Sequence, residues 1–201
     1  MANRIAAIDG GMSYHLNALS DKAWAGLIDE RIYLPKLSQA DLKKFDVVIV
    51  TCRSNPDLLE PCRDQFLDFL DAGGTVAAFS GTSPERWLPG VVAREIPTNY
   101  WWWLEEGADS GLRIGAPKHP VFAALTLREF TWHHHARFEP PAGATSLVNH
   151  VSGGSIFYED RASCGGRLFV TSLDPFYHHG SFFMPTTSRF LAAFLPWIKH
   201  N

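Results

Sequence analysis

The sequence predicts an α/β fold whose central strands are parallel, and this prediction depends on residues 46–82. Residues 47–50 form a continuous β-branched run, which is typical of a strand buried on both faces. A helix follows, because apolar residues recur on one face of residues 62–70 and Gly73 suits its end. Residues 76–79 form a second apolar run. A strand, a helix and a strand with short connections predict a βαβ unit with parallel strands.

The remaining elements follow from hydrophobic periodicity and from the positions of glycine and proline. Before the βαβ unit we expect a strand at 4–9, a helix at 13–27, a strand at 31–34 and a short helix at 39–45. After it we expect strands at 91–96, 112–114, 130–138, 155–158 and 168–173, and a helix at 187–195 that Pro196 ends or bends. Proline, glycine, tryptophan and histidine are frequent in residues 87–149, so we expect a β-rich elaboration there.

Composition and charge restrict the class of protein. With 201 residues, 46% of them hydrophobic and 19% charged, the chain is expected to form a single globular domain, residues 1–201. The net charge of −3 argues against binding to nucleic acid or to an anionic membrane surface. No apolar run approaches the roughly 20 residues that span a membrane, and the start of the chain lacks a signal-peptide pattern. We therefore expect a soluble, cytoplasmic protein.

Four segments carry a family resemblance. They are Asp-Val-Val-Ile at 46–49, Phe-Leu-Asp-Ala-Gly-Gly-Thr-Val at 69–76, Lys-His-Pro-Val-Phe-Ala-Ala-Leu at 118–125 and Gly-Arg-Leu-Phe-Val-Thr-Ser-Leu at 166–173. With them the chain resembles the class I glutamine amidotransferase-like superfamily, and within it the ThuA-like proteins, which are named for trehalose utilisation. The resemblance implies a flavodoxin-like three-layer sandwich with a mostly parallel central sheet, to which the β-rich elaboration at about residues 87–149 is added.

Glutaminases of this superfamily carry a Gly-x-Cys-x-Gly turn after the fourth strand, and this chain departs from that pattern. Residues 77–81 read Ala-Ala-Phe-Ser-Gly, without the cysteine nucleophile. The resemblance therefore implies a ThuA-like, amidotransferase-like protein that binds or acts on a small polar metabolite, for example a carbohydrate, and is not a glutaminase. If the protein is an enzyme, we expect a hydrolase-type or metal-assisted activity. The alternative is a non-catalytic domain used for assembly or ligand sensing.

Several candidate site residues follow strands of the predicted parallel sheet, because open α/β sheets bind ligands at the carboxyl ends of their strands. Ser80 lies where a nucleophile elbow would lie, at the carboxyl end of a central strand, His178 is the best candidate for its base, and Asp174 completes the catalytic set. The alternative for Ser80 is a structural role in the turn that follows its strand. Ligand contacts at the same edge are expected from Gly10, Gly11, Arg53 and Gly81.

His133 and His135 lie two residues apart in the predicted strand at 130–138, so their side chains are expected on the same face. Imidazoles in such positions can contact a ligand or share a divalent metal ion such as zinc. The residues that could complete a metal site are His178, His179 and Asp174. The alternative is a strand face that is solvated or lines a ligand site. His134 is expected on the opposite, apolar face.

The run Trp101, Trp102 and Trp103 provides a large aromatic surface. Indole rings can stack against a sugar or another flat molecule, which would make Trp102 and its neighbours a wall of the ligand site. The alternatives are packing beneath a long loop and a contact in a homo-oligomer, because aromatic residues are enriched at interfaces. The partners expected from the sequence are therefore a small-molecule ligand and, under the last alternative, a second copy of the chain.

Overall fold

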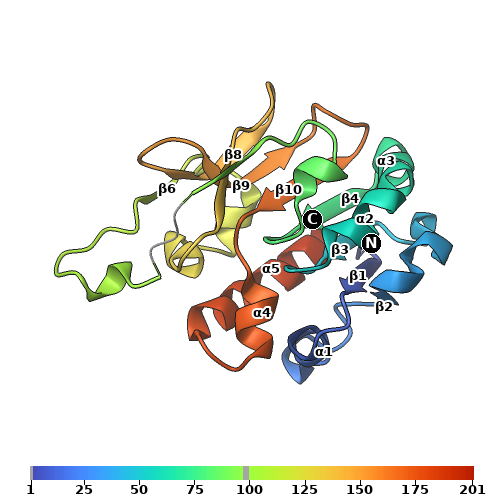
Figure 1. Cartoon of the computed structure of the whole chain (residues 1–201), viewed down its shortest axis with the longest axis horizontal. Coiled ribbons are helices and arrows are strands. Elements are labelled where there is room, and N and C mark those ends of the chain that lie inside the picture. Colours follow the sequence, from blue (N-terminus) through green and yellow to red (C-terminus); the bar gives the residue numbers. More distant parts are fainter. Residues whose placement is uncertain (1, 97–99) are drawn as a thin grey trace.

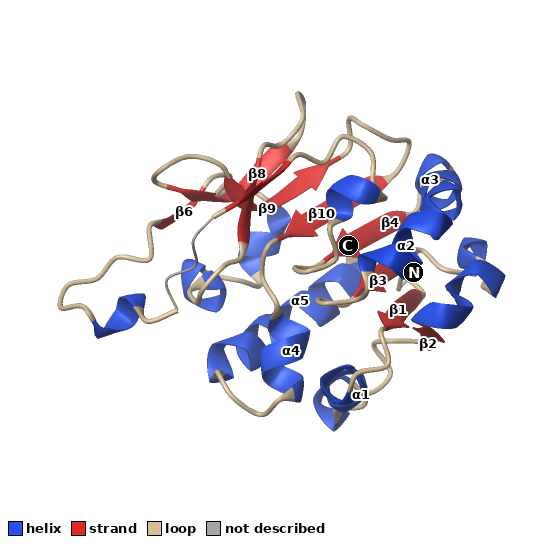
Figure 2. Cartoon of the chain, in the orientation of Figure 1, coloured by secondary structure: helices blue, strands red, loops and turns tan. Residues whose placement is uncertain are grey.

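The computed structural model describes residues 2–96 and 100–201 (Figures 1 and 2). Its strands are β1 Ile5–Asp9, β2 Glu30–Tyr33, β3 Val47–Val50, β4 Thr75–Ala78, β5 Ala93–Glu95, β6 Leu112–Ile114, β7 Ala136–Phe138, β8 Thr145–His150, β9 Ser155–Asp160 and β10 Arg167–Thr171. Its α-helices are α1 Ser13–Leu19, α2 Pro56–Leu59, α3 Arg63–Asp71, α4 Pro175–Gly180 and α5 Pro185–His200. Within these residues no helix combines the length and the apolar composition that crossing a membrane requires.

The strands pair in the order β2-β1-β3-β4-β10-β9-β7-β5, while β8 also pairs with β9 and β6 pairs with β8. The pairs from β2 to β10 are parallel, and the pairs beyond β10 are antiparallel. The prediction of a mostly parallel sheet is therefore wrong, and the sheet is mixed. Residues 151–154 and 161–166 are too short to cross over a sheet, so the strands they join are antiparallel. The three-layer sandwich and the single domain stay predictions.

Side chains that alternate along the parallel strands enter two separate hydrophobic cores on opposite faces of the sheet. On β3, Val47 and Ile49 join the core that contains residues of α1, α4 and α5. Val48 and Val50 join the core that contains residues of α2 and α3. All of β3 is buried, so the prediction of a strand buried on both faces is confirmed. The βαβ prediction is also confirmed, because β3 and β4 are parallel neighbours with α2 and α3 between them in sequence.

The predicted strand at 130–138 is wrong for most of its length. Leu127–Phe130 form a 3-10 turn, and only Ala136–Phe138 lie in a strand. A local hydrogen-bonding motif accounts for this turn. The hydroxyl and the amide of Thr126 both donate to Glu129 Oε2, at 2.6 and 2.9 Å, which closes a capping box around the turn. The three consecutive histidines consequently lie on an irregular segment and do not follow the strict alternation of a strand.

Two predicted helices in the first part of the chain are also shorter than expected. The helix predicted at 13–27 ends at Leu19, and a separate 3-10 turn follows it. Asp21 begins that turn, because its carboxylate accepts a hydrogen bond from the Ala23 amide at 2.8 Å. The short helix predicted at 39–45 is replaced by 3-10 turns on either side of Ala40.

Pro196 is predicted to end or bend the last helix, and it does not end it, because α5 continues from Pro185 to His200. A proline in a helix interior removes a backbone donor and crowds the preceding turn, which costs about 3 kcal/mol. Leu195, Trp197 and Ile198 around it are buried in the core. Burial of each such side chain contributes about 2 kcal/mol, which offsets the proline.

A buried carboxylate connects β9 to β10. Glu159 forms ion pairs with Arg167 on the neighbouring strand, with Arg161 at 3.0 Å and with His119 at 3.0 Å. Burial opposes the ionisation of Glu159, but the hydrogen bond with His119 and the charge of Arg167 outweigh it and lower the pKa of the carboxyl to about 2. The Arg167 guanidinium lies 4.4 Å from the centre of the Phe169 ring, so the pair is packed as well as charged.

Glu159 is expected to stabilise the fold at neutral pH and to lose this contribution in acid. The pKa of the carboxyl is lower in the folded chain than in the unfolded chain, so the contribution is complete above the unfolded value and is lost as pH falls toward 2. We expect Glu159→Gln to lower the free energy of unfolding by about 2 kcal/mol at neutral pH, and by less at a pH of about 3. Urea unfolding of both proteins measures the difference, and the exposed Glu105→Gln serves as control. A pH-independent difference would contradict the assignment.

Candidate functional site

The ends of β3, β4 and β10 meet at the edge of the sheet where open α/β folds bind ligands. The Arg53 amide donates to the Ser80 carbonyl at 2.7 Å, and the Ser80 amide donates to the Leu173 carbonyl at 3.1 Å. Gly81 has a φ of +73°, and a Cβ there would lie 3.2 Å from the Arg53 side chain, so the turn requires glycine. This arrangement delivers Asp174, which follows β10, to the same edge.

Asp174 is the centre of the candidate site, and its side chain is fully buried. Its Oδ2 accepts a hydrogen bond from Arg53 Nη2 at 2.9 Å and lies 3.1 Å from His135 Nε2. Its Oδ1 lies 3.0 Å from His178 Nε2 and accepts a longer hydrogen bond from Trp132 Nε1 at 3.3 Å. Burial alone would raise the pKa of Asp174, but hydrogen bonds from His135 and His178 outweigh it and hold that pKa well below its usual range.

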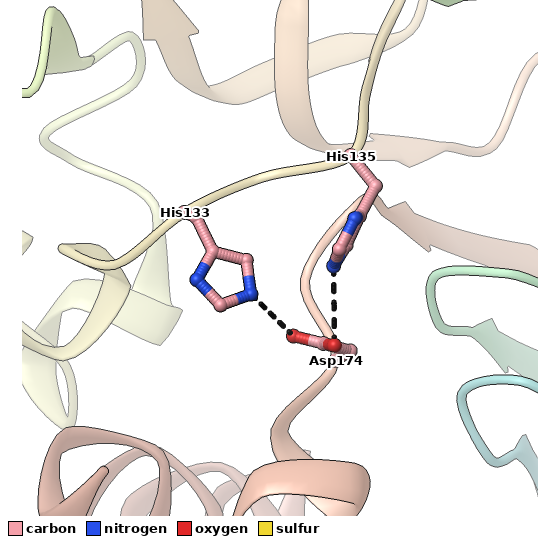
Figure 3. A group of neighbouring side chains, drawn as sticks. All are labelled: His133, His135 and Asp174. Atoms are coloured by element: carbon pink, nitrogen blue, oxygen red, sulfur yellow. Dashed lines mark hydrogen bonds and ion pairs between the residues drawn. The ribbon is translucent and has the colours of Figure 1, made fainter. Parts of the chain in front are cut away.

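His133 lies beside this carboxylate, with its Nε2 atom 3.9 Å from Asp174 Oδ1 and 3.0 Å from His178 Nε2. Figure 3 shows the His133 and His135 rings directed at Asp174 from one loop. Burial lowers the pKa of His133 to about 4, because the attraction of Asp174 opposes the shift only in part. At neutral pH the His133 imidazole is therefore uncharged and can accept a proton. We refer to His133, His135, His178 and Asp174 as the histidine–aspartate cluster.

Arg53 connects Asp174 with Tyr177. Its guanidinium carbon lies 3.7 Å from the centre of the Tyr177 ring while Nη2 pairs with the Asp174 carboxylate. The backbone φ of Arg53 is +62°, in the left-handed region that residues with a Cβ seldom occupy. The side chain is 38% exposed, so the guanidinium is both held in place and accessible. Strained backbone positions of this kind concentrate at functional sites.

Two cavities open beside Asp174. The larger has a volume of about 850 Å³, and Arg53, His133 and His178 line it together with aromatic residues. These aromatic residues are Tyr100, Trp101, Trp102, Trp103, Trp132, Tyr177 and Phe183. The smaller cavity, of about 390 Å³, is lined in part by Arg53, Ser80, Gly81 and His135. Trp102 is half-buried, whereas Trp101 and Trp103 are 63% and 49% exposed, so the tryptophan run lies at the mouth of the larger cavity.

Some predicted site residues lie apart from the cluster. Gly10 and Gly11 follow β1, and the Gly10 amide donates to His15 Nδ1 at 3.1 Å. Neither glycine is among the described residues that line the two cavities. Ser80 lines the smaller cavity and His178 the larger one, and no hydrogen bond joins their side chains in the part of the chain that the structure describes. The nucleophile and base roles of this pair stay predictions.

His134 and His179 also lie outside the cluster. The His134 ring packs against the His150 ring, with their centres 5.4 Å apart. His179 Nε2 lies 2.9 Å from Asp21 Oδ2, on the side of α4 that faces the turn after α1. Among the residues expected to complete a metal site, His179 is therefore the one that the fold directs elsewhere.

Sequence patterns do not single out Trp132, Tyr177 or Tyr100, although the structure places all three at the site. The only available signal is adjacency, because Trp132 precedes His133 and Tyr177 precedes His178. In a regular strand Trp132 and His133 would point to opposite faces. On the irregular segment that carries them, both side chains reach Asp174 or the cavity beside it.

Cys52, directly after β3, is another residue whose type permits nucleophilic chemistry. Its side chain is buried, and its Sγ accepts a hydrogen bond from the Tyr177 amide at 3.2 Å. Burial raises the pKa of the thiol, and the neighbouring Arg53 does not reverse this shift. Cys52 is therefore a packed thiol at neutral pH and is not an available thiolate.

Known proteins share this fold. No family model matches the sequence, and no curated protein matches it significantly. A cytoplasmic protein from Salmonella typhimurium LT2 superposes with a TM-score of 0.61 at 11% identity, over 98% of this chain and 99% of that chain. A protein from Bacteroides uniformis ATCC 8492 described as ThuA-like has a TM-score of 0.54 at 14% identity, over 95% and 89%. A glutamine amidotransferase from Thermotoga maritima has a TM-score of 0.56 at 12% identity, over 98% and 84%.

The chain therefore has the α/β fold of glutamine amidotransferase-like proteins, with a candidate ligand site at the carboxyl edge of its parallel strands. The ThuA-like protein shares this fold, so the resemblance seen in the sequence motifs is confirmed at the level of the fold. At identities of 11–14% the similarity establishes how the chain folds. Its chemistry has to be argued from the side chains of this chain.

The left-handed backbone of Arg53 predicts that a glycine variant at this position is more stable than an alanine variant. Arg53→Ala and Arg53→Gly both remove a donor from the buried Asp174 carboxylate, so both are expected to be less stable than wild type. Glycine adopts this conformation without a Cβ clash, so Arg53→Gly should be more stable than Arg53→Ala by about 1 kcal/mol. Guanidinium unfolding of the three proteins measures the order. An alanine variant as stable as the glycine variant would show that the backbone is not strained.

Proposed function

We propose that this chain binds a small polar metabolite with an apolar face, a carbohydrate being the leading class, and acts on it through the histidine–aspartate cluster. One observation supports the proposal above all. The lining of the 850 Å³ cavity combines aromatic rings with the imidazoles of His133 and His178 and the guanidinium of Arg53. A sugar is complementary to this lining, because its C–H face stacks on an indole ring and its hydroxyls form hydrogen bonds with the polar groups.

The cluster is suited to proton transfer in a hydrolase-type reaction. His133 is uncharged and lines the larger cavity, so it can accept a proton from a bound hydroxyl or from water. His178 Nε2 lies 3.0 Å from His133 Nε2 and 3.0 Å from the Asp174 carboxylate. The buried negative charge of Asp174 stabilises the imidazolium that forms when a proton is accepted. The cluster therefore combines a general base, His133, with the buried negative charge of Asp174.

A non-catalytic role in ligand sensing is the second candidate, and the environment of Ser80 favours it. Ser80 is 6% exposed, and no hydrogen bond in the described chain connects its hydroxyl with an imidazole. A cluster without an activated nucleophile can hold a ligand through the same contacts and leave it unchanged. The two candidates share the binding step and differ in turnover, so product formation from a bound ligand decides between them.

Binding in the larger cavity is tested by calorimetric titration with mono- and disaccharides, polyols and sugar acids. We expect saturable binding of at least one of these classes to the wild-type protein. Trp102→Ala should weaken that binding about fivefold, because its half-buried ring lines the cavity and an aromatic stacking contact contributes about 1 kcal/mol. Absence of saturable binding for all four classes would contradict the carbohydrate proposal.

The control is Tyr33→Ala, which removes an exposed aromatic ring on β2, the last strand at the other end of the sheet. Its ligand affinity should equal that of wild type. Light scattering on Trp102→Ala and Trp103→Ala separates a ligand wall from a subunit contact. An unchanged mass with weaker binding supports the ligand wall. A reduced mass with unchanged binding would assign the tryptophan run to an interface between copies of the chain.

The chain is also expected to release no glutamate from glutamine. Residues 77–81 lack the glutaminase cysteine, and Cys52 on the neighbouring strand end is buried with a raised thiol pKa. A coupled glutamate assay on wild type and Cys52→Ala measures this. Glutamate release that disappears in Cys52→Ala would place the nucleophile one strand away from the expected position and would overturn the prediction.

A further inference from the structure

The histidine–aspartate cluster brings four potential metal-ligand side chains together. His133 Nε2, His135 Nε2 and a carboxylate oxygen of Asp174 all lie within 4.8 Å of one another. His178 Nε2 lies 3.0 Å from both His133 Nε2 and Asp174 Oδ1. The ligand atoms of His133 and His135 point toward the carboxylate in Figure 3, and His178 approaches it from α4. Three imidazole rings therefore gather around the two oxygens of one carboxylate.

The separations between these atoms are close to those in a metal coordination shell. Zinc binds imidazole nitrogen and carboxylate oxygen at about 2.0–2.2 Å, so neighbouring ligand atoms of a tetrahedral site are about 3.3 Å apart. His178 Nε2 lies 3.0 Å from His133 Nε2 and 3.0 Å from Asp174 Oδ1, and His135 Nε2 lies 3.1 Å from the other carboxylate oxygen, Oδ2. The distance from His133 Nε2 to Asp174 Oδ1 is longer, at 3.9 Å.

The contact between two imidazoles favours a cation at this point. His133 Nε2 and His178 Nε2 face each other at 3.0 Å, so only one of them can carry a hydrogen in the contact. Asp174 Oδ1 lies 3.0 Å from the same His178 atom and competes for that hydrogen. A single proton cannot form good hydrogen bonds with all three atoms. A metal ion can bind the lone pairs of all three at once.

The donor set indicates the class of metal. Three imidazole nitrogens and one carboxylate oxygen suit zinc and neighbouring divalent transition metals, whereas calcium and magnesium prefer oxygen ligands. We infer that His133, His135, His178 and Asp174 bind one divalent transition-metal ion of the zinc class. His133 lines the larger cavity and His135 the smaller one, so the ion would lie between the two cavities.

Arg53 is the group that opposes metal binding. Its guanidinium pairs with Asp174 Oδ2 at 2.9 Å, so an ion must share the carboxylate with an existing positive charge. The side chain is long, 38% exposed and already lines the larger cavity, into which it can withdraw. We expect a dissociation constant in the micromolar range, weaker than that of a closed structural zinc site.

The inference concerns the same cluster as the proposed function, and a bound ion would occupy the lone pair with which His133 accepts a proton in the metal-free protein. The test uses metal ions alone, so its failure would leave carbohydrate binding unaffected. Untagged protein is freed of metal with a chelator and titrated with zinc chloride by calorimetry. We expect one equivalent of zinc per chain. Cobalt chloride should give the visible spectrum of a tetrahedral nitrogen and oxygen site, without a thiolate charge-transfer band. No stoichiometric uptake, or a thiolate band that assigns the ion to a cysteine, would overturn the inference.

Matched variants locate the ion. His135→Gln should weaken zinc binding at least fiftyfold, and because the His135 side chain is partly exposed, the variant should leave the core intact. His134→Gln is the control, because it alters the adjacent histidine, whose ring packs on His150, and it should bind zinc as wild type does. Circular dichroism verifies that both variants are folded. Equal affinities for His135→Gln and wild type, or an equal loss in His134→Gln, would refute the site.

Discussion

The buried negative charge of Asp174 is the constraint on which the candidate site depends. A carboxylate without solvent is stable only when donors and positive charge surround it. Arg53 provides one donor from the end of β3, Trp132 and His135 approach from the segment before β7, and His178 approaches from α4. The hydrogen bonds and positive charge that the buried Asp174 carboxylate requires therefore hold together segments that are far apart in the sequence. Moving any one of them would leave part of the charge uncompensated.

The position of β10 explains how these segments meet. β10 has the parallel neighbour β4 on one side and the antiparallel neighbour β9 on the other, so it forms the boundary between the two halves of the sheet (Figure 1). The His135 amide donates to the Ser172 carbonyl at 3.4 Å, which seats the histidine segment directly beside the end of β10. The carboxyl edge of the parallel strands, where the candidate site lies, and the antiparallel part of the chain thus meet at Asp174.

The chemistry available at this edge differs from that of a glutaminase. The strand ends carry a buried hydroxyl at Ser80 and a packed thiol at Cys52. The groups arranged around the larger cavity are instead imidazoles, a guanidinium and aromatic rings, with the Asp174 charge behind them. Such groups bind ligands, transfer protons and coordinate metal ions without a covalent intermediate. The fold is shared with amidotransferase-like proteins, so the chemistry has to be argued from the reactive groups of this chain.

The sequence by itself determined the βαβ core, because the β-branched run of β3 and the apolar stripe of α3 are local patterns with a fixed period. It also indicated Asp174 and His178 through their places after a strand, and His133 and His135 through their residue type and their spacing of two. Only the tertiary structure decided that β8 exists, that the sheet is mixed and that the histidines lie on an irregular segment. The physical reason is that strand pairing and the solvation of a buried charge depend on residues distant in sequence, which no local pattern encodes.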